Sequence, residues 1–370
     1  MTRWAILTGE YPPQPGGVSD YTRLVAAALA AACDEVRVFA PPAHGDSTAT
    51  RLPDHFGPRG LWALDRELAR FRPDRILIQY VPHAFGWKGM NLPFAAWVAA
   101  RARRIAPVWV MFHEVWFPFR WRPVSHAVLG ATTRAMARLV AGAAARVFVS
   151  IPAWGELVRR ACPRARPAEW LPVPCGVGTE ATYVAIAEVR RGLPAGAEIV
   201  GHFGTFGRFI TDMLEPAIRE LLTARPRVRV VLAGRNSEVF RDRLQSDRVT
   251  ATGDLAADQL PAHLRACDVL LQPYPDGISS RRTSAMAGLA NGVPVVSNFG
   301  FLSEPLWATT DGVRVAAGPD PSALAAAVGD VLDLPPAARA ALGERGAHLY
   351  RTTFDISHTV TRLRSPERSA

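Results

Sequence analysis

Short apolar segments of strand length alternate with alanine-rich segments of helical length along nearly the whole chain. The strand-like segments are WAILTG, EVRVFA, RILIQY, PVWVMFH and ARVFVS in the first half, and EIVGHFG, VRVVLAG, RVTATG, DVLLQPY and PVVSN in the second. The stretches between them predict helices near 19–32, 61–70, 93–104, 127–143, 212–224, 257–266 and 281–291. Apolar strands separated by helices are typical of parallel sheets covered on both faces. The sequence therefore predicts an α/β fold with two doubly wound halves.

The length of the chain indicates two domains. At 370 residues it exceeds the size at which a single hydrophobic core usually stops growing. Between 162 and 196 the sequence is rich in proline, glycine and alanine, which interrupt regular elements. We place the connection near 173–178. This gives a first domain over 1–174, a second over 175–348, and a C-terminal helix and tail over 349–370 that we expect to pack back on the first domain.

The composition is that of an ordinary folded protein with an excess of arginine. Hydrophobic residues make up 49% and charged residues 21%, which excludes disordered, collagen-like and coiled-coil chains. The net charge is +10, and Lys88 is the only lysine, so arginine supplies 42 of the 43 basic residues. The arginines are scattered among alanines without a recognition motif, so we expect no nucleic-acid partner.

Cysteine spacing and apolar runs bear on the cellular context. The cysteines lie far apart, without the spacing of a zinc site or a disulfide framework. The apolar run at the N-terminus is too short for a signal peptide, and the longest runs elsewhere are interrupted by arginine. We therefore expect a cytoplasmic protein, with peripheral contact at the inner face of a membrane left open.

The loop after the first strand is a candidate anion site. In doubly wound folds, ligands lie outside the carboxyl ends of the strands. Gly16 and Gly17 follow the first strand and directly precede a helix whose expected cap is Ser19. Glycines allow the backbone to approach a ligand closely, and a helix start presents free amides. A diphosphate could rest here, although a loop that only turns the chain has the same features.

Two further strand ends in the first half carry polar and aromatic side chains. His113 follows PVWVMF and is a candidate to contact a bound sugar through its ring or its carbonyl. The aromatic run WFPFRW after it fits core packing, a platform for an apolar or sugar acceptor, or an interfacial patch at a membrane. The acceptor candidates at these strand ends are Tyr80, His83, Trp87, Lys88, Asn91 and Glu114.

The segment from Pro273 to Ser297, PYPDGISSRRTSAMAGLANGVPVVS, is the richest in chemistry. Arg281 and Arg282 lie in the first turn of the expected helix, where the helix dipole disfavours cations. Their placement indicates that an anion sits among the arginines and the free amides. The alternative is solvated surface arginine in an arginine-rich protein.

Together these segments resemble the family 4 glycosyltransferases of the GT-B fold. The likeness covers most of the chain, through the Gly-Gly loop, MFHEVW, the linker VPCGV, the strands HFG and VLAG, and the run from VTATGD to PYPDG followed by SAMAGLANGVPVVS. The resemblance implies two Rossmann-like domains facing a central cleft, the first binding the acceptor and the second the nucleotide sugar. It implies a retaining enzyme that moves a hexose-type sugar from a nucleoside diphosphate to a hydroxyl of a glycan, a lipid-linked sugar or a natural product. No cofactor or metal is expected, and the chain has no DxD motif.

Two places depart from the family pattern. The family usually has two glutamates separated by seven residues, where this chain has Asp276 and Ser284. The arginine and lysine that commonly follow HFG are replaced by Thr205 and Ile210. Because a diphosphate still needs cations around it, we expect nearby arginines to take over that charge.

The residues and the resemblance together predict the following roles. His113 and Asp276 are the catalytic candidates. The donor diphosphate is assigned to Gly16, Gly17, Arg208, Ser280, Arg281 and Arg282. The donor sugar is assigned to Gly277, Ile278 and Ser279, and the nucleoside to Arg235, Thr250, Thr252 and Ser284.

Two other functions fit the same sequence. A GT-B protein that has lost catalysis and acts as a binding or scaffolding partner is suggested by the missing glutamates and the missing Arg/Lys pair. A sugar-nucleotide epimerase on the same plan is the other. A phosphorylase dependent on pyridoxal phosphate is disfavoured, because Lys88 is the only lysine and lies in the wrong half.

Overall fold

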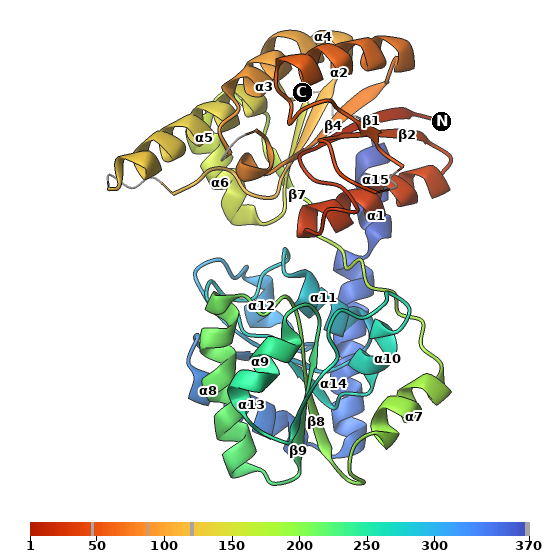
Figure 1. Ribbon diagram of the computed structural model, residues 1–370, viewed down its shortest axis with the longest axis vertical. Helices are drawn as coiled ribbons and strands as arrows, with labels where there is room; N and C mark the ends of the chain where they lie inside the picture. The colour runs from red at the N-terminus through yellow and green to blue at the C-terminus, as the bar shows by residue number, and fades with distance from the viewer. Residues whose placement is uncertain (46–47, 87–88, 119–121, 367–370) are drawn as a thin grey trace. The chain divides into compact units, whose positions relative to one another are not determined.

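The computed structural model describes residues 1–45, 48–86, 89–118 and 122–366. The chain divides into two compact units. One consists of Met1–Val173 together with the segment that begins at Ile356, and the other of Pro174–Asp355. Each unit is a parallel sheet with helices on both faces (Figure 1). The predicted α/β fold with two doubly wound halves is therefore confirmed.

The first unit is built on a sheet of seven strands, and every described strand pairing in it is parallel. The order across the sheet is β3-β2-β1-β4-β5-β6-β7. The strands are β1 (Arg3–Thr8), β2 (Glu35–Ala40), β3 (Thr50–Arg51), β4 (Arg75–Tyr80), β5 (Val108–Phe112), β6 (Arg146–Val149) and β7 (Ala168–Trp170). The five predicted strands form the centre. The sequence did not indicate the edge strands β3 and β7, because two or three residues are too few to show an apolar pattern.

Two apolar clusters cover the faces of this sheet. One packs α2, α3, α5 and α6 against it, and the other packs α1 and α15. The helices of the unit are α1 (Gly17–Ala31), α2 (Pro58–Phe71), α3 (Leu92–Trp97), α4 (Arg103–Ile105), α5 (Val124–Ala143), α6 (Pro152–Ala161) and α15 (Ile356–Arg364), with π-helical turns at Val98–Ala102. Helix α1 begins at Gly17, so the predicted cap Ser19 lies inside the helix and Gly16 is the N-cap residue.

The end of the chain is shared between the two units. We expected 349–370 to pack on the first domain, but Tyr350 and Phe354 are buried in the core of the second unit. Only α15 belongs to the first unit, where Leu363 packs in the core beside α1. Its end is held by Arg75 and Arg146, which donate to the carbonyls of Leu363 and Arg362 at 3.0 and 3.2 Å.

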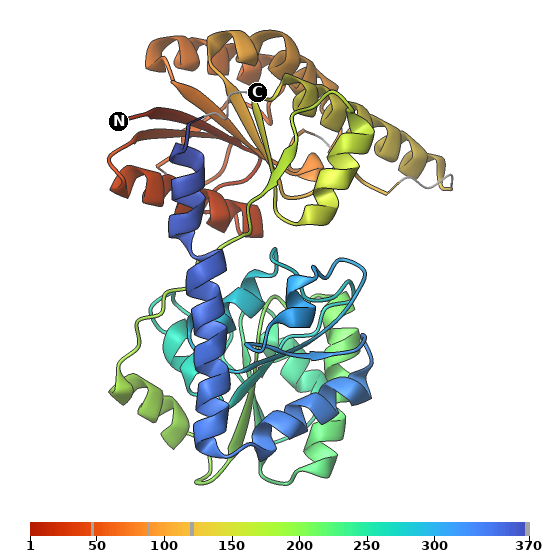
Figure 2. The same cartoon turned by 180° about the vertical axis from the view of Figure 1, so that it is seen from behind.

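The second unit is built on a sheet of six parallel strands in the order β10-β9-β8-β11-β12-β13. The strands are β8 (Glu198–Phe203), β9 (Val228–Ala233), β10 (Val249–Ala251), β11 (Val269–Leu271), β12 (Val295–Asn298) and β13 (Arg314–Ala316). The helices are α7 (Tyr183–Arg191), α8 (Arg208–Ala224), α9 (Ser237–Leu244), α10 (Leu260–Arg265), α11 (Thr283–Ala290), α12 (Leu306–Thr309), α13 (Pro321–Asp333) and α14 (Pro336–Leu349). One cluster packs α8 and α13 on the sheet, and another packs α10 and α11 on its other face. Figure 2 shows α14 running past α11 on that second face.

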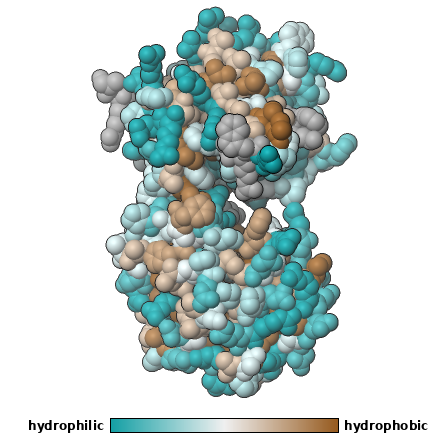
Figure 3. Space-filling model, turned by 90° about the vertical axis from the view of Figure 1, so that its left-hand side faces the viewer, coloured by the Kyte–Doolittle hydropathy of each residue, from teal (hydrophilic) through white to brown (hydrophobic). Residues whose placement is uncertain are grey.

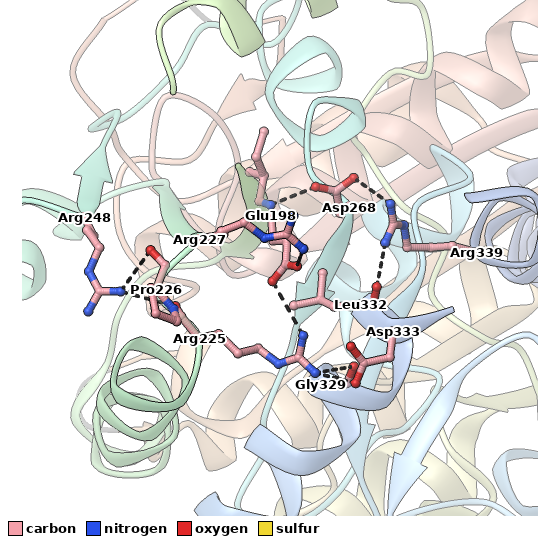
Figure 4. Close-up of polar contacts among 11 residues, drawn as sticks. Glu198, Arg225, Pro226, Arg227, Arg248, Asp268, Gly329, Leu332, Asp333 and Arg339 are labelled. Atoms are coloured by element: carbon pink, nitrogen blue, oxygen red, sulfur yellow. Dashed lines mark hydrogen bonds and ion pairs between the residues drawn. The ribbon is translucent and has the colours of Figure 1, made fainter. Parts of the chain in front are cut away.

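Ion pairs tie together the amino ends of the strands in the second sheet (Figure 4). Asp268, just before β11, accepts from the backbone amide of Ile199 at 2.8 Å and lies 3.5 Å from Arg339. Glu198, at the start of β8, accepts from Arg227 at 2.7 Å and also pairs with Arg225. These contacts hold β8 and β11 in register at the edge opposite to the loops discussed below.

Every helix in the described ranges is too short or too polar to cross a membrane. On the face drawn in Figure 3, hydrophobic and hydrophilic residues are intermixed.

Candidate functional site

The loop after β11 is fixed by the loop after β12. The side chain of Asn298 binds Tyr274 through both of its backbone groups, accepting at 2.9 Å and donating at 2.8 Å. Gly277 has a φ of +87°, and a Cβ there would lie 2.2 Å from the amide nitrogen of Gly300. Only glycine fits such a conformation at so close an approach. Both loops lie at the carboxyl ends of their strands, where ligands bind in doubly wound folds.

Arg281 and Arg282 are paired with Asp276. Arg281 Nη2 donates to Asp276 Oδ2 at 2.5 Å, and Arg282 Nη2 donates to Oδ1 of the same carboxylate. The sequence predicted the two arginines in the first turn of a helix, but α11 begins at Thr283, so both precede the helix. The structure thus brings three predicted site residues together, with the carboxylate of Asp276 between the two arginines.

A buried tyrosine connects this cluster to Ser284. The guanidinium of Arg282 lies 4.6 Å from the centre of the Tyr274 ring, a cation–π contact. The Tyr274 hydroxyl lies 2.7 Å from Ser284 Oγ, and burial raises the pKa of the tyrosine above its ordinary value. Ser284, predicted to contact the nucleoside, therefore already has a polar partner within the unit.

Glu304 is a site residue that the sequence analysis missed. Its buried carboxylate accepts from the Ser280 amide at 3.0 Å, from the Ser280 hydroxyl, and from Trp307 Nε1 at 2.7 Å. Ser280, predicted to bind the diphosphate, is fully buried and is held by this carboxylate. Glu304 therefore anchors the segment between Asp276 and the start of α11 through Ser280.

Two predicted donor-sugar residues are part of the core. Ile278 and Ser279 are both 0% exposed, and Ile278 packs in the apolar cluster that carries α11. The Ile278 amide donates to the Asn298 carbonyl at 2.9 Å. The side chains of Ile278 and Ser279 therefore serve the packing of the loop, and the assignment of these residues to the donor sugar stays a prediction.

The ends of β8, β9 and β10 meet through glycine. A Cβ at Gly234, which has a φ of +115°, would lie 2.2 Å from the Gly204 carbonyl oxygen, and the Gly234 amide donates to the Gly253 carbonyl at 3.0 Å. The predicted nucleoside residues lie around this junction. Arg235 Nη2 is 3.6 Å from Asp254 Oδ2, while Thr252 Oγ1 donates to the Gly253 carbonyl.

Thr250 and Arg208 make their described contacts away from Asp276, Arg281 and Arg282. Thr250, on β10, donates its hydroxyl to the Val230 carbonyl at 3.3 Å. Arg208 is the first residue of α8, and its largely exposed side chain lies 3.6 Å from Asp212 one turn on. The described contacts do not join Arg208 to Arg281 or Arg282.

His202, on β8, is a second residue that the sequence analysis missed. Its Nδ1–H donates to the Leu271 carbonyl at 2.8 Å, and its ring packs edge-on against Phe206. Burial lowers the pKa of this histidine from 6.5 to about 4. The ring is therefore neutral at neutral pH and joins the ends of β8 and β11.

His113 is placed at the end of β5, as predicted, and is almost fully buried. Its Nε2–H donates to Gln79 Oε1 at 2.9 Å, and its ring lies edge-on to Tyr21. Burial lowers the pKa of His113 to about 3, so the ring is neutral near pH 7 and can offer a hydrogen bond but not a positive charge. Its carbonyl accepts from Trp154 Nε1 at 2.8 Å.

The start of α1 is occupied by a carboxylate of the chain itself. Glu10 Oε1 accepts from the amides of Val18 and Ser19, each at 3.0 Å. A Cβ at Gly16 would lie 2.4 Å from that same oxygen, while one at Gly17 would meet nothing within 4 Å. Glu10 thus supplies an anion at the helix start, and the assignment of Gly16 and Gly17 to the donor diphosphate stays a prediction.

The predicted acceptor residues fall into three groups. Tyr80 is 0% exposed in the aromatic core, and Asn91 caps α3 by accepting from the Phe94 amide at 2.9 Å, so both have structural roles, and their assignment to the acceptor stays a prediction. His83 and Glu114 lie together at the surface, with Nδ1 and Oε2 3.6 Å apart. Trp87 and Lys88 lie outside the described residues.

Metal ligands are not gathered anywhere in the part of the chain that the structure describes: no group of three or more His, Cys, Asp or Glu could hold an ion. The loop after β11, residues 272–282, is called the donor loop below, and the cations in it are arginines, which bind phosphate through paired N–H groups.

Comparison with known proteins agrees with this architecture. Residues 16–176 match the family described as "Glycosyl transferase 4-like domain", and residues 198–333 match "Glycosyl transferases group 1". No curated protein sequence matches the chain.

Solved structures of the same fold cover nearly the whole chain. Sucrose-phosphate synthase from Thermosynechococcus elongatus has a TM-score of 0.72 at 18% identity, covering 98% of this chain and 97% of its own. WaaG, a glycosyltransferase of lipopolysaccharide biosynthesis, has a TM-score of 0.69 at 17% identity, covering 99% and 100%. HepE of Anabaena in complex with UDP-glucose has a TM-score of 0.68 at 17% identity, covering 98% of each chain. Because two glycosyltransferase family models match the two halves of the chain and solved glycosyltransferases share its fold, the chain belongs to the family 4-type glycosyltransferases of the GT-B fold.

Proposed function

We propose that this glycosyltransferase moves a hexose-type sugar from a nucleoside diphosphate to a hydroxyl acceptor, with retention of anomeric configuration and without a metal. The observation that carries the proposal is the pair Arg281 and Arg282, held at the carboxyl end of the second sheet directly before α11. Two planar guanidinium groups offer the paired N–H donors that a diphosphate accepts. Departure of the nucleoside diphosphate builds up negative charge, which these cations would stabilise in place of a metal ion.

Other candidate residues in each unit would have separate parts in the reaction. Asp276 is the carboxylate that would accept hydrogen bonds from sugar hydroxyls in the loaded site, and Glu304 holds the loop through Ser280. His113 is neutral at working pH because its pKa is lowered to about 3, so its part would be to orient a sugar by hydrogen bonding or packing. The base for the acceptor hydroxyl would then be the leaving phosphate, whose oxygens lie next to the reacting carbon.

The proposal gives the donor and the acceptor as chemical classes and not as particular molecules. HepE of Anabaena binds UDP and UDP-glucose, which supports a nucleotide sugar as the donor class here. The acceptor classes in the proposal are glycans, lipid-linked sugars and natural products. The acceptor-side candidates in the proposal are His83 and Glu114, whose side chains lie together at the surface. The proposal places the enzyme in the cytoplasm, with peripheral contact at a membrane if the acceptor is lipid-linked.

The test is donor binding by Arg281→Ala. A charge-assisted hydrogen bond contributes roughly 1.5–3 kcal/mol, so the affinity for the nucleoside diphosphate should fall by about 10- to 100-fold. Arg314→Ala is the matched control, because Arg314 pairs with Asp330 on the surface of the same unit. Unchanged affinity in Arg281→Ala would contradict the proposal.

The two other functions give different products. A scaffolding protein would bind a protein partner and would not release nucleoside diphosphate from a sugar nucleotide. An epimerase would convert the sugar nucleotide without an acceptor. Slow donor hydrolysis that yields free sugar and nucleoside diphosphate, with no epimerised sugar nucleotide, supports transfer over both.

A further inference from the structure

The carboxylate of Asp276 occupies the same N–H groups that an entering diphosphate would need. Its two oxygens each accept from one arginine, Oδ2 from Arg281 and Oδ1 from Arg282. The aspartate side chain is 13% exposed and the arginines are 21% and 23% exposed, so the three groups form a partly buried cluster with one surplus positive charge. In such a place, charges are screened less than on the open surface.

Asp276 cannot follow the arginines if they turn away, because its backbone is fixed. Its carbonyl accepts from the Leu302 amide at 3.0 Å, and the next residue, Gly277, touches the backbone of Gly300. The arginine side chains are long and rotatable. Arg282 also rests on the Tyr274 ring, which keeps its guanidinium nearby when the ion pair opens.

We propose that Asp276 is an intramolecular competitor of the donor diphosphate, a role that rests on the proposed function of this site. Binding exchanges one carboxylate for two linked phosphates on Arg281 and Arg282. The exchange selects against ligands with a single phosphate, whose smaller charge does not displace the carboxylate. It also frees the oxygens of Asp276 for the hydroxyls of the donor sugar, so that the site accepts the sugar only after the diphosphate has bound.

The experiment is titration calorimetry of Asp276→Asn, which keeps the shape of the side chain and removes its charge. The probes are inorganic pyrophosphate, inorganic phosphate and the nucleoside diphosphate that binds the wild type. Asp276→Asn should bind pyrophosphate and the nucleoside diphosphate at least about five times more tightly than the wild type, with a smaller preference for pyrophosphate over phosphate. Release of nucleoside diphosphate from the sugar nucleotide should nevertheless become slower, because the sugar loses its carboxylate.

Asp330→Asn is the control. It makes the same change in net charge on the same unit, at an exposed pair with Arg314, and should leave all affinities unchanged. Asp276→Ser is a second variant, with circular dichroism to verify folding, in case the asparagine is poorly accommodated. Equal or weaker pyrophosphate binding in the folded Asp276 variants, or an equal gain in Asp330→Asn, overturns the competitor role alone. Failure of the wild type and both variants to bind any nucleoside diphosphate overturns the proposed function and this inference together.

Discussion

Removing the carboxylate of Glu304 tests how the donor loop is held. In Glu304→Ala, three buried donors lose their acceptor: the Ser280 amide, the Ser280 hydroxyl and Trp307 Nε1–H. Ser280 is 0% and Trp307 1% exposed, so bulk water does not reach either donor without rearrangement. The loop that carries Asp276 and the arginines should loosen at its anchor.

The size of the effect follows from the number of unpaired groups. An unsatisfied buried donor costs about 1–3 kcal/mol, and hydrogen bonds to a charged group lie at the upper end of that range. Water entering the space left by the side chain would recover part of this cost. We therefore expect Glu304→Ala to lower the free energy of unfolding by about 3 kcal/mol. Glu304→Gln should lower it by about 1 kcal/mol, because the amide keeps one acceptor oxygen but turns an NH₂ group toward another donor.

The measurement is urea denaturation followed by circular dichroism, with nucleoside diphosphate affinity measured on the folded variants. Glu344→Ala is the matched control, since Glu344 pairs with Arg351 at the surface, and it should change stability by less than about 0.5 kcal/mol. A loss below 1 kcal/mol in Glu304→Ala would contradict the anchoring role of the Glu304 carboxylate. If both Glu304 variants bind the nucleoside diphosphate as tightly as the wild type, Glu304 has no part in holding the binding site.

Two other predictions concern backbone conformation and pH. Gly277→Ala should lower the free energy of unfolding by about 1–3 kcal/mol and weaken nucleotide binding, because a Cβ would meet Gly300 and the φ of +87° disfavours any residue but glycine. Gly196 has a φ of +73° and open space around it, so Gly196→Ala measures the cost of the backbone conformation alone. Equal losses in the two variants would contradict the close contact at Gly277. His202 has its pKa lowered from 6.5 to about 4, so the stability it contributes is complete above pH 6.5 and falls as the pH drops toward 4, by up to about 3 kcal/mol. His202→Gln should flatten the acid side of the stability–pH profile measured by urea denaturation, and an unchanged slope would count against a buried neutral ring.

The periodic part of the fold could be predicted from the sequence. The central strands of both sheets are apolar on both faces and stand out as runs, whereas β3, β7 and β13 are two or three residues long and carry no such pattern. Helices α6, α7, α9, α12, α13 and α14 lie outside the predicted helix ranges. The division of the chain after α14 between the two units depends on which core Tyr350 and Phe354 join.

The site could be predicted in position and only partly in contacts. The segment around Asp276 was identified because its three charged residues lie within seven positions of one another. Its anchors Glu304 and Asn298 lie more than twenty residues away, and nothing local marks them as partners. Likewise, Glu10 precedes the glycine pair by several residues, and the sequence alone does not show that its carboxylate folds back onto α1.

Tyr80 and Asn91 illustrate the same limit. A polar side chain at a strand end suits a binding site and a structural cap equally well. Only the tertiary packing decides that Tyr80 lies among the aromatic rings of the core and that Asn91 caps α3.

The most direct test of the proposed donor site is a thermal-shift panel of nucleoside diphosphates on the wild type and on the double variant Arg281→Ala, Arg282→Ala. A ligand at a hundred times its Kd stabilises the folded protein by about 2.7 kcal/mol, which gives a clear rise in Tm. At least one of UDP, GDP, ADP and TDP should raise the Tm of the wild type, and the rise should be lost in the double variant. No rise with any of them, or an equal rise in the double variant, would contradict a donor site built on this arginine pair.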